Sequence, residues 1–348
     1  MHDISAQISD ITTQLVEWEN KIKSAANVLK EKNKAALGNV FLEDYLFIKT
    51  KPLDNPDITV AGIDGGLLKK ECHGINIILT RAVCAVFKYK DMKLHETTYF
   101  PSAFPMPHIK VLNSSAEDSD FAVASSVERV RCELSLAVDM LDKGGIDFLF
   151  LDGSVALHPS LRPADESSLN DEYGKLLGIV AAMYSKSIEN GIILAGIVED
   201  SRSRTFVKNC AEKLGSSIMK NIENVKDTHL LSYCLSVGER TSIFKMEDYG
   251  KIGKNTFSFY IRPSEFDRAL RVDFVAGDNP VETGSKIASA VFFMSRHNST
   301  YGIPPVIIDA DQRAKLSEDE LAFVQNEIRR YAGDITSVSE LRRNIRPF

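Results

Sequence analysis

Apolar residues near the N-terminus recur with the spacing of a packed helix. The intervals alternate between four and three residues over about three and a half heptads. This spacing predicts a helix over residues 4–29 with an apolar seam along one side. Because so short a seam is marginal alone, a second chain, a partner protein or the body of the same domain must cover it. The seam consists of Ile4, Ile8, Ile11, Leu15, Trp18, Ile22, Ala25 and Leu29.

The middle of the chain alternates between strand and helix patterns. Three strands come first, then the 119–143 helix, which is closed by Gly144 and Gly145. A strand ending at Asp152, a helix over 168–189, another strand and another helix follow. The order β-β-β-α-β-α-β-α predicts an α/β fold with a mixed, RNase H-like sheet. The predicted strands are residues 58–64, 75–89, 94–100, 146–152 and 192–198.

The last third of the chain is less regular. We predict a loop-rich strand region over 241–274, a helix over 281–295 and an apolar run at 304–309. A further helix begins at the capping box formed by Ser317 and Glu320. The domain boundaries predicted from these patterns are an N-terminal helical region (1–50), an α/β domain of RNase H-like fold (55–325) and a C-terminal helical tail (326–348).

Composition narrows the class of protein. The 348 residues carry a formal charge of −6, and no apolar run approaches the roughly 18 residues of a membrane span. The five cysteines are widely spaced, so neither a disulfide framework nor a zinc site is predicted. The first residues lack the pattern of a secretory signal, and we expect a cytoplasmic protein without a membrane partner.

Two aspartates are the first candidates for chemistry. Asp64 and Asp152 each end an apolar run and precede glycine, so adjacent strands would present them side by side. With Glu133 from the 119–143 helix they would form an oxygen-rich site for Mg²⁺ or Mn²⁺. Glu128 lies about 140° around that helix from Glu133, so only one of the two is expected to face the site. The alternative is that each Asp-Gly pair only makes a turn.

Several blocks together resemble the NurA nuclease family over residues 55–320. They are AGIDGG, RVRCEL, FLFLDGS, GIVEDSRSR, LLSYCLSVGERTSIF, FYIRPSEFDRALRVDF and YGIPPVIIDADQRAKLS, in this order. The resemblance implies an RNase H-like fold, a homodimer and a nuclease that depends on two Mn²⁺ (or Mg²⁺) ions. It further implies 5′ to 3′ degradation of DNA, with cutting of single strands as a second capacity. The implied partner is the hexameric translocase HerA, and the implied setting is end resection in double-strand break repair at the nucleoid.

The resemblance also implies particular site residues. Asp64, Glu133 and Asp152 become metal ligands, and a tyrosine and a histidine are expected near the end of the domain. Tyr301 matches the tyrosine, but Asp311 stands where the histidine is expected. An aspartate can still bind a hard cation, though it cannot replace an imidazole as acid or base.

Two further positions depart from the family pattern. Gly66 replaces a serine or threonine of the first motif, and Glu199 stands where a basic residue is expected. The second departure removes one expected phosphate contact.

A locally positive segment is the candidate DNA-binding region. Residues 202–273 contain thirteen Lys and Arg against nine Asp and Glu. Arginine suits phosphate because its planar fork donates two hydrogen bonds. For each arginine the alternative is an ion pair with Asp200, Glu239, Asp267 or Asp273. The candidates are Arg202, Arg204, Arg240, Arg262, Arg268 and Arg271.

Two other functions compete with a nuclease. A sugar-kinase or actin-like ATPase would also carry Asp-Gly loops on a related sheet, but the C-terminal half lacks a clear second copy. A catalytically silent adaptor for DNA ends or for the translocase would keep the fold without the chemistry. Metal-dependent cleavage that requires Asp64 would distinguish the nuclease from the adaptor.

Overall fold

The computed structural model describes residues 2–34, 40–55, 57–113, 118–214, 222, 224–246, 255–296, 298–333 and 335–342. The chain divides into two compact units. One unit contains residues 1–54, 197–247 and 255–304, and the other contains 55–196, 248–254 and 305–348. Both are therefore built from segments that are far apart in the sequence.

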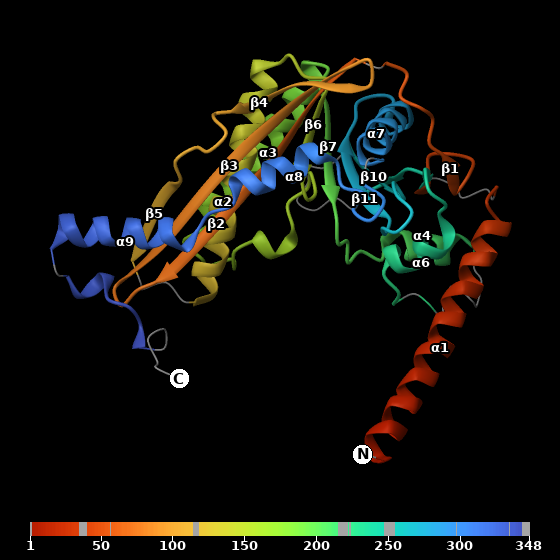
Figure 1. The fold of residues 1–348 in the computed structure, drawn as a ribbon, viewed down its shortest axis with the longest axis horizontal. Coiled ribbons are helices and arrows are strands. Elements are labelled where there is room, and N and C mark those ends of the chain that lie inside the picture. Colours follow the sequence, from red (N-terminus) through yellow and green to blue (C-terminus); the bar gives the residue numbers. More distant parts are fainter. Residues whose placement is uncertain are drawn as a thin grey trace. The chain divides into compact units, whose positions relative to one another are not determined.

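The second unit holds the sheet predicted from the strand order (Figure 1). Its strands lie in the order β7-β6-β2-β3-β4, with β5 paired to β3. β2, β3 and β4 are antiparallel neighbours, and β6 runs parallel to β2. This arrangement confirms the predicted RNase H-like sheet. The strands are β2 (Ile58–Glu71), β3 (Ile75–Lys90), β4 (Lys93–Phe100), β5 (His108–Asn113), β6 (Phe148–Asp152) and β7 (Ile193–Val198), which the unit boundary divides.

Helices cover both faces of this sheet. α2 (Asp118–Lys143) and α3 (Asn170–Glu189) pack on one face, while α8 (Pro305–Ala314) and α9 (Glu318–Ala332) lie on the other (Figure 1). The apolar run at 304–309 is thus the start of a helix. The predicted capping box is confirmed, since Ser317 Oγ accepts from the Glu320 amide and the Glu320 carboxylate accepts from the Ser317 amide.

The end of strand β2 and the position of helix α9 bear on two predicted boundaries. The strand through Asp64 does not stop at a tight turn; β2 continues to Glu71, paired with β3 along its whole length. Residue 326, where the predicted tail begins, lies inside α9, and residues 343–348 are outside the described part. Short 3₁₀ turns occupy Pro159–Leu161 and Thr336–Val338.

The first unit combines a smaller set of strands with helices. Its strands lie in the order β1-β8-β10-β11, with β9 paired to β10. None of the described helices of the chain combines the length and hydropathy needed to cross a membrane. The elements of this unit are α1 (His2–Glu31), β1 (Phe47–Lys49), α4 (Thr205–Leu214), α6 (Asp227–Cys234), β8 (Glu239–Thr241), β9 (Phe244–Lys245), β10 (Thr256–Ile261), β11 (Leu270–Val275) and α7 (Pro280–Ser295).

The predicted N-terminal helix is confirmed as α1, and its seam has two parts. Ile22, Ala25 and Leu29 are buried in an apolar cluster with residues of α4 and α6. Ile4, Ile8, Ile11 and Leu15 are instead 56–62% exposed, and Trp18 is 36% exposed. The body of its own unit therefore covers only the C-terminal part of the seam.

Glycines in β2 allow α8 to lie directly on the strand. A Cβ atom on Gly66 would lie 2.0 Å from the carbonyl oxygen of Ala314, and one on Gly62 would lie 2.7 Å from that of Val306. Both distances are shorter than any tolerable contact with rigid backbone. The missing hydroxyl residue at position 66 is thus explained by helix packing.

We predict that Gly66→Ala lowers the free energy of unfolding by about 1–3 kcal/mol, because α8 must move away from β2. Gly178→Ala is the control, since Gly178 lies within α3 with open space around it. That change should raise stability by about 0.5–1 kcal/mol. Urea unfolding of both variants measures the difference, and an unchanged midpoint for Gly66→Ala would contradict the packing constraint.

Candidate metal centre and DNA-binding residues

The sheet register aligns the two predicted aspartates. Ile63 of β2 pairs with Leu151 of β6 in parallel, so the next residues of the two neighbouring strands are Asp64 and Asp152. Asp64 is only 5% exposed, whereas Asp152 is exposed. The backbone N–H of Gly65 donates to Asp64 Oδ1 at 2.7 Å and holds that carboxylate in place.

Helix α8 brings Asp311 to Asp64. Asp64, Gly62 and Gly66 alternate along β2 with their side-chain directions on the face that α8 covers. Burial raises the pKa of Asp64, and the adjacent Asp311 carboxyl raises it further, against the opposing effect of the Gly65 amide. The two carboxyl groups therefore share one site although 247 positions separate them in the sequence.

Glu133 reaches the same site from α2, on the other face of the sheet. A Cβ atom on Gly65 would lie 2.5 Å from Glu133 Cγ, so the side chain occupies the space that this glycine leaves open. Burial raises the pKa of Glu133 to about 8; Arg129 opposes the rise, while Asp64 and Asp152 contribute to it. Its Oε1 atom lies 3.0 Å from Arg129 Nη1 but accepts no hydrogen bond from the described residues.

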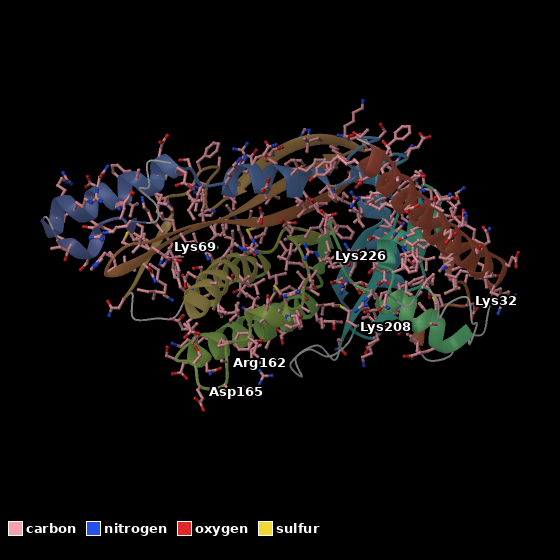
Figure 2. The ribbon with its side chains drawn as sticks, turned by 90° about the horizontal axis from the view of Figure 1, so that it is seen from below. Lys32, Lys69, Arg162, Asp165, Lys208 and Lys226 are labelled. Atoms are coloured by element: carbon pink, nitrogen blue, oxygen red, sulfur yellow. The ribbon has the colours of Figure 1, made fainter. Side chains whose placement is uncertain are left out.

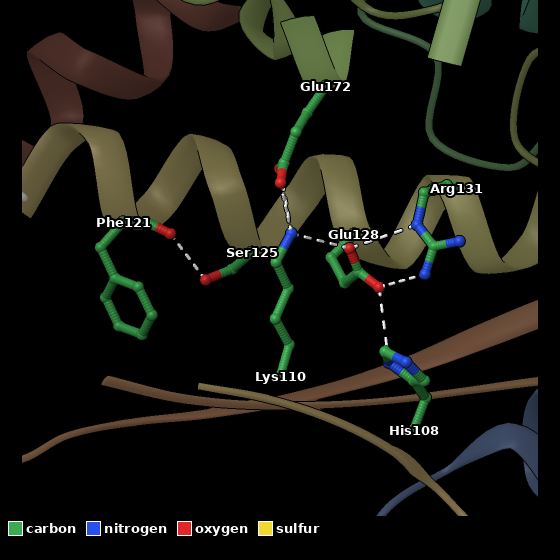
Figure 3. Close-up of polar contacts among 7 residues, drawn as sticks. All are labelled: His108, Lys110, Phe121, Ser125, Glu128, Arg131 and Glu172. Carbon is green, nitrogen blue, oxygen red and sulfur yellow. Dashed lines mark hydrogen bonds and ion pairs between the residues drawn. The ribbon is translucent and has the colours of Figure 1, made fainter. Parts of the chain in front are cut away.

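Glu128, the alternative on the same helix, belongs to a different cluster (Figure 3). It binds Arg131, Lys110 at 3.2 Å and His108 at 3.5 Å, and Lys110 also binds Glu172 of α3 at 2.9 Å. Glu128 is 2% exposed, and its charge is compensated by groups from α2 and β5. These ion pairs lower its pKa despite burial. Its role is to join α2, α3 and β5.

The four carboxylates are the candidate ligands for a hard divalent cation. Within the described residues, no three His, Cys, Asp or Glu side chains are close enough to form a ready-made metal site. The donor chemistry nevertheless suits Mn²⁺ or Mg²⁺, which prefer carboxylate oxygens. The buried Glu133 oxygen without a hydrogen bond is the kind of atom that a cation would satisfy. The carboxylates are Asp64, Glu133, Asp152 and Asp311, all in the second unit.

Comparison with known proteins agrees with this fold. The model of the NurA domain family matches residues 58–316. This chain belongs to the NurA family. No curated protein sequence matches it.

Among solved structures, the NurA nuclease from Sulfolobus solfataricus is 18% identical, covers 94% of this chain and 99% of its own, and gives a TM-score of 0.55. A NurA structure with manganese is 10% identical over 95% of this chain and 99% of its own, with a TM-score of 0.50. A NurA structure bound to dAMP and manganese is also 10% identical, over 93% and 96%, with a TM-score of 0.50. At these identities the structures establish the fold that this NurA-family chain shares with them.

The remaining predicted NurA site residue, Tyr301, lies in the first unit. It is 42% exposed, and its hydroxyl group donates to Glu199 Oε1 at 3.0 Å. Glu199 directly follows β7 and is the residue that stands in place of an expected base. The two residues that depart from the family pattern therefore have different surroundings. Glu199 contacts Tyr301, a predicted site residue, whereas Gly66 lets α8 pack on β2.

Three of the six predicted DNA-binding arginines are used inside the protein. Arg240 is 3% exposed and forms a two-pronged ion pair with Glu43 at 2.6 and 2.7 Å. Arg262 donates to the carbonyls of Ser232, Leu235 and Glu265. Arg271 pairs with Asp273 at 2.7 Å. These internal bonds help to hold the first unit together and compete with any contact to phosphate.

The other three arginines are exposed. Arg268 is 74% exposed and forms the predicted alternative, an ion pair at 3.3 Å with Asp200, which is itself 86% exposed; Arg204 donates to Asn224 at 2.7 Å. Arg202 is also exposed. Two exposed lysines lie in the same unit: Lys208 on α4, and Lys226, which directly precedes α6 (Figure 2). The sequence alone does not separate these outward cations from the internal ones.

One residue of the site escaped the sequence analysis. Arg129 pairs with Glu133 one helical turn later, and its Nη1 lies 3.5 Å from the Gly65 carbonyl oxygen. The available signal was the spacing of four residues between a basic and an acidic residue on one predicted helix.

We predict that Glu133→Gln changes the stability of the metal-free protein at neutral pH by less than about 1 kcal/mol, because the raised pKa of Glu133 leaves this buried group mostly uncharged there and glutamine keeps its size. Thermal unfolding in EDTA measures this. Glu128→Gln is the matched control, and it should lower stability by about 1–3 kcal/mol, because Arg131 loses its carboxylate partner and Lys110 keeps only Glu172. Equal destabilisation of the two variants would contradict the distinct roles assigned to them.

Proposed function

We propose that this NurA-family protein is a metal-dependent deoxyribonuclease. The observation that carries the proposal is the convergence of Asp64, Glu133, Asp152 and Asp311 beside a buried, unsatisfied carboxylate oxygen. One or two Mn²⁺ or Mg²⁺ ions held there would activate water and stabilise the leaving oxygen of a phosphodiester. The related structure that contains dAMP and manganese supports the same assignment.

The protein residues supply position and charge. The hydrogen bond from Gly65 fixes Asp64, and Arg129 keeps a positive group next to Glu133. We propose Tyr301 as a further catalytic residue that the resemblance implies. Asp311 would act as a metal ligand, since a carboxylate cannot take over the acid–base role of an imidazole.

The exposed cations of the first unit are the proposed DNA contacts. Arg202, Arg204 and Arg268 would bind phosphates without reading sequence. We leave Arg240, Arg262 and Arg271 out of the proposed DNA contacts because they form bonds inside the protein.

Family membership also supports finer proposals. The enzyme would degrade single-stranded DNA and duplex ends from 5′ to 3′, with endonuclease activity on single strands. It would act as a homodimer with a HerA-type hexameric translocase in end resection during double-strand break repair, at the nucleoid.

We expect Asp64→Asn and Asp152→Asn to lower Mn²⁺-dependent cleavage by more than about a hundredfold, because each removes a ligand charge. Linear DNA labelled at the 5′ or 3′ end, incubated with Mn²⁺, Mg²⁺ or EDTA, measures rate and polarity. Arg268→Ala is the control: it should weaken DNA binding but keep the rate at saturating DNA. DNA binding without cleavage under every condition, with or without the translocase, would favour the silent adaptor.

The exposed half of the α1 seam is the proposed contact with a second copy of the chain. The heptad positions that flank it are Ser5, Gln7, Thr12 and Gln14, none of them charged. Two such helices can pair in either direction without repulsion between like charges. Ile8, Ile11 and Leu15 would then become buried, as their spacing suggests.

We predict that Ile8→Glu combined with Leu15→Glu converts a dimer into a monomer that keeps its fold by circular dichroism, because both side chains are exposed within the chain. Light scattering after size exclusion measures the mass. Val16→Glu is the control, since Val16 is 54% exposed but lies off the seam. A double variant that remains dimeric but no longer binds the translocase would assign the seam to that partner instead.

A further inference from the structure

The loop between β4 and β5 presents two large apolar side chains to solvent. Phe104 is 69% exposed and Met106 is 86% exposed, and prolines at 101, 105 and 107 flank them. Proline fixes the backbone angle φ, so this short loop has few conformations available. Two such side chains, two residues apart on a loop of restricted conformation, form a candidate contact surface.

A buried arginine anchors this loop. Arg81 of β3 is 8% exposed, and its Nε donates to the Pro105 carbonyl at 2.7 Å. The same guanidinium donates to the Lys315 carbonyl at 3.1 Å and pairs with Glu320 at the start of α9. The loop is thus tied to the end of α8 and the start of α9. Phe104 and Met106 are exposed on a fixed support.

Phe104 also belongs to a stack of planar groups. The guanidinium of Arg313 lies 3.8 Å from the ring centre of Tyr99 and 5.1 Å from that of Phe104. Asp309 accepts from Arg313 Nε at 3.0 Å, and Arg313 donates to the Tyr99 hydroxyl at 2.7 Å. Arg313 therefore contacts both aromatic rings, while 69% of Phe104 remains exposed.

Helix α8 links this stack to the carboxylates. Asp311 and Arg313 are two residues apart on one ten-residue helix, about 200° around its axis. They flank the stripe that packs on β2. A strand of DNA held at the carboxylates would therefore have the aromatic stack nearby, across the width of a single helix.

We propose that Phe104, with Arg313 and Tyr99, is a stacking platform for an unpaired base of DNA. The inference rests on the proposed function in taking DNA as the ligand. Aromatic rings and planar guanidinium groups are the usual platforms for single-stranded nucleic acid, because every base has a flat face. Paired bases inside a duplex cannot use the platform, so it favours single strands over duplexes. A protein partner is the competing occupant, and the test separates the two.

The test measures binding of a fluorescent oligo-dT and of a blunt duplex in EDTA, where cleavage does not intervene. Phe104→Ala should weaken oligo-dT binding about tenfold and change duplex binding less than about twofold. Arg313→Lys, which keeps the charge but loses the plane, should also weaken oligo-dT binding selectively. Phe323→Ala is the matched control, since Phe323 is 61% exposed on α9 of the same unit.

Unchanged oligo-dT binding in folded Phe104→Ala protein would overturn the proposal and leave the loop to a protein partner. Equal loss of single-strand and duplex binding would also overturn it. Failure of the nuclease proposal is seen separately, because cleavage in Mn²⁺ is measured on the parent protein. Selective loss of oligo-dT binding in a protein that never cleaves DNA would keep the platform and reject the nuclease.

Discussion

The close approach of two helices to strand β2 is the constraint on which the candidate metal centre depends. Gly62 and Gly66 let α8 lie against one face of the strand, and Gly65 leaves room for Glu133 from α2 on the other. Any side chain at these positions would push a helix, and its carboxylate, away from Asp64. A strand without side chains at three of five positions is a poor strand by propensity, and the packing of two helices compensates for it.

Charge distribution separates the structural ion pairs from the candidate centre. Buried Glu128 and Arg240 each have an opposite charge within bonding distance. These ion pairs compensate the buried charges and join elements of the fold. Glu133 and Asp64 are equally buried, but their closest charged neighbours include other carboxylates, which raises both pKa values. Such an arrangement is expected of the proposed cation-binding centre, because a bound cation would offset the repulsion between the carboxylates.

Exposed apolar side chains mark two further surfaces, one in each unit. The open half of the α1 seam has the regular spacing of a helix that pairs with another helix. The Phe104 loop is irregular, short and anchored by Arg81, and it offers single flat groups in place of a continuous stripe. A regular apolar stripe on a helix suits pairing with another helix, whereas single exposed aromatic rings suit stacking with bases. We therefore propose a different type of partner for each surface.

The sequence by itself determined most helices and strands of the second unit and the pairing of Asp64 with Asp152 in the candidate site. Strand order follows from local patterns of β-branched and helical residues, and the two Asp-Gly pairs mark equivalent strand positions because parallel neighbours share a register. It also placed Glu133 and Asp311 among the ligand candidates, the second through family resemblance.

Only the tertiary structure decided the rest. It showed that β2 continues past Asp64, that residues 304–309 begin a helix, and that three of six arginines are bound internally. It also brought Tyr99, Phe104 and Arg313 together from separate segments. These outcomes depend on which residue from a distant segment meets each side chain. An arginine that binds phosphate and one that binds a distant carboxylate, as Arg240 binds Glu43, look the same in the sequence. Only the contacts made on folding distinguish the two.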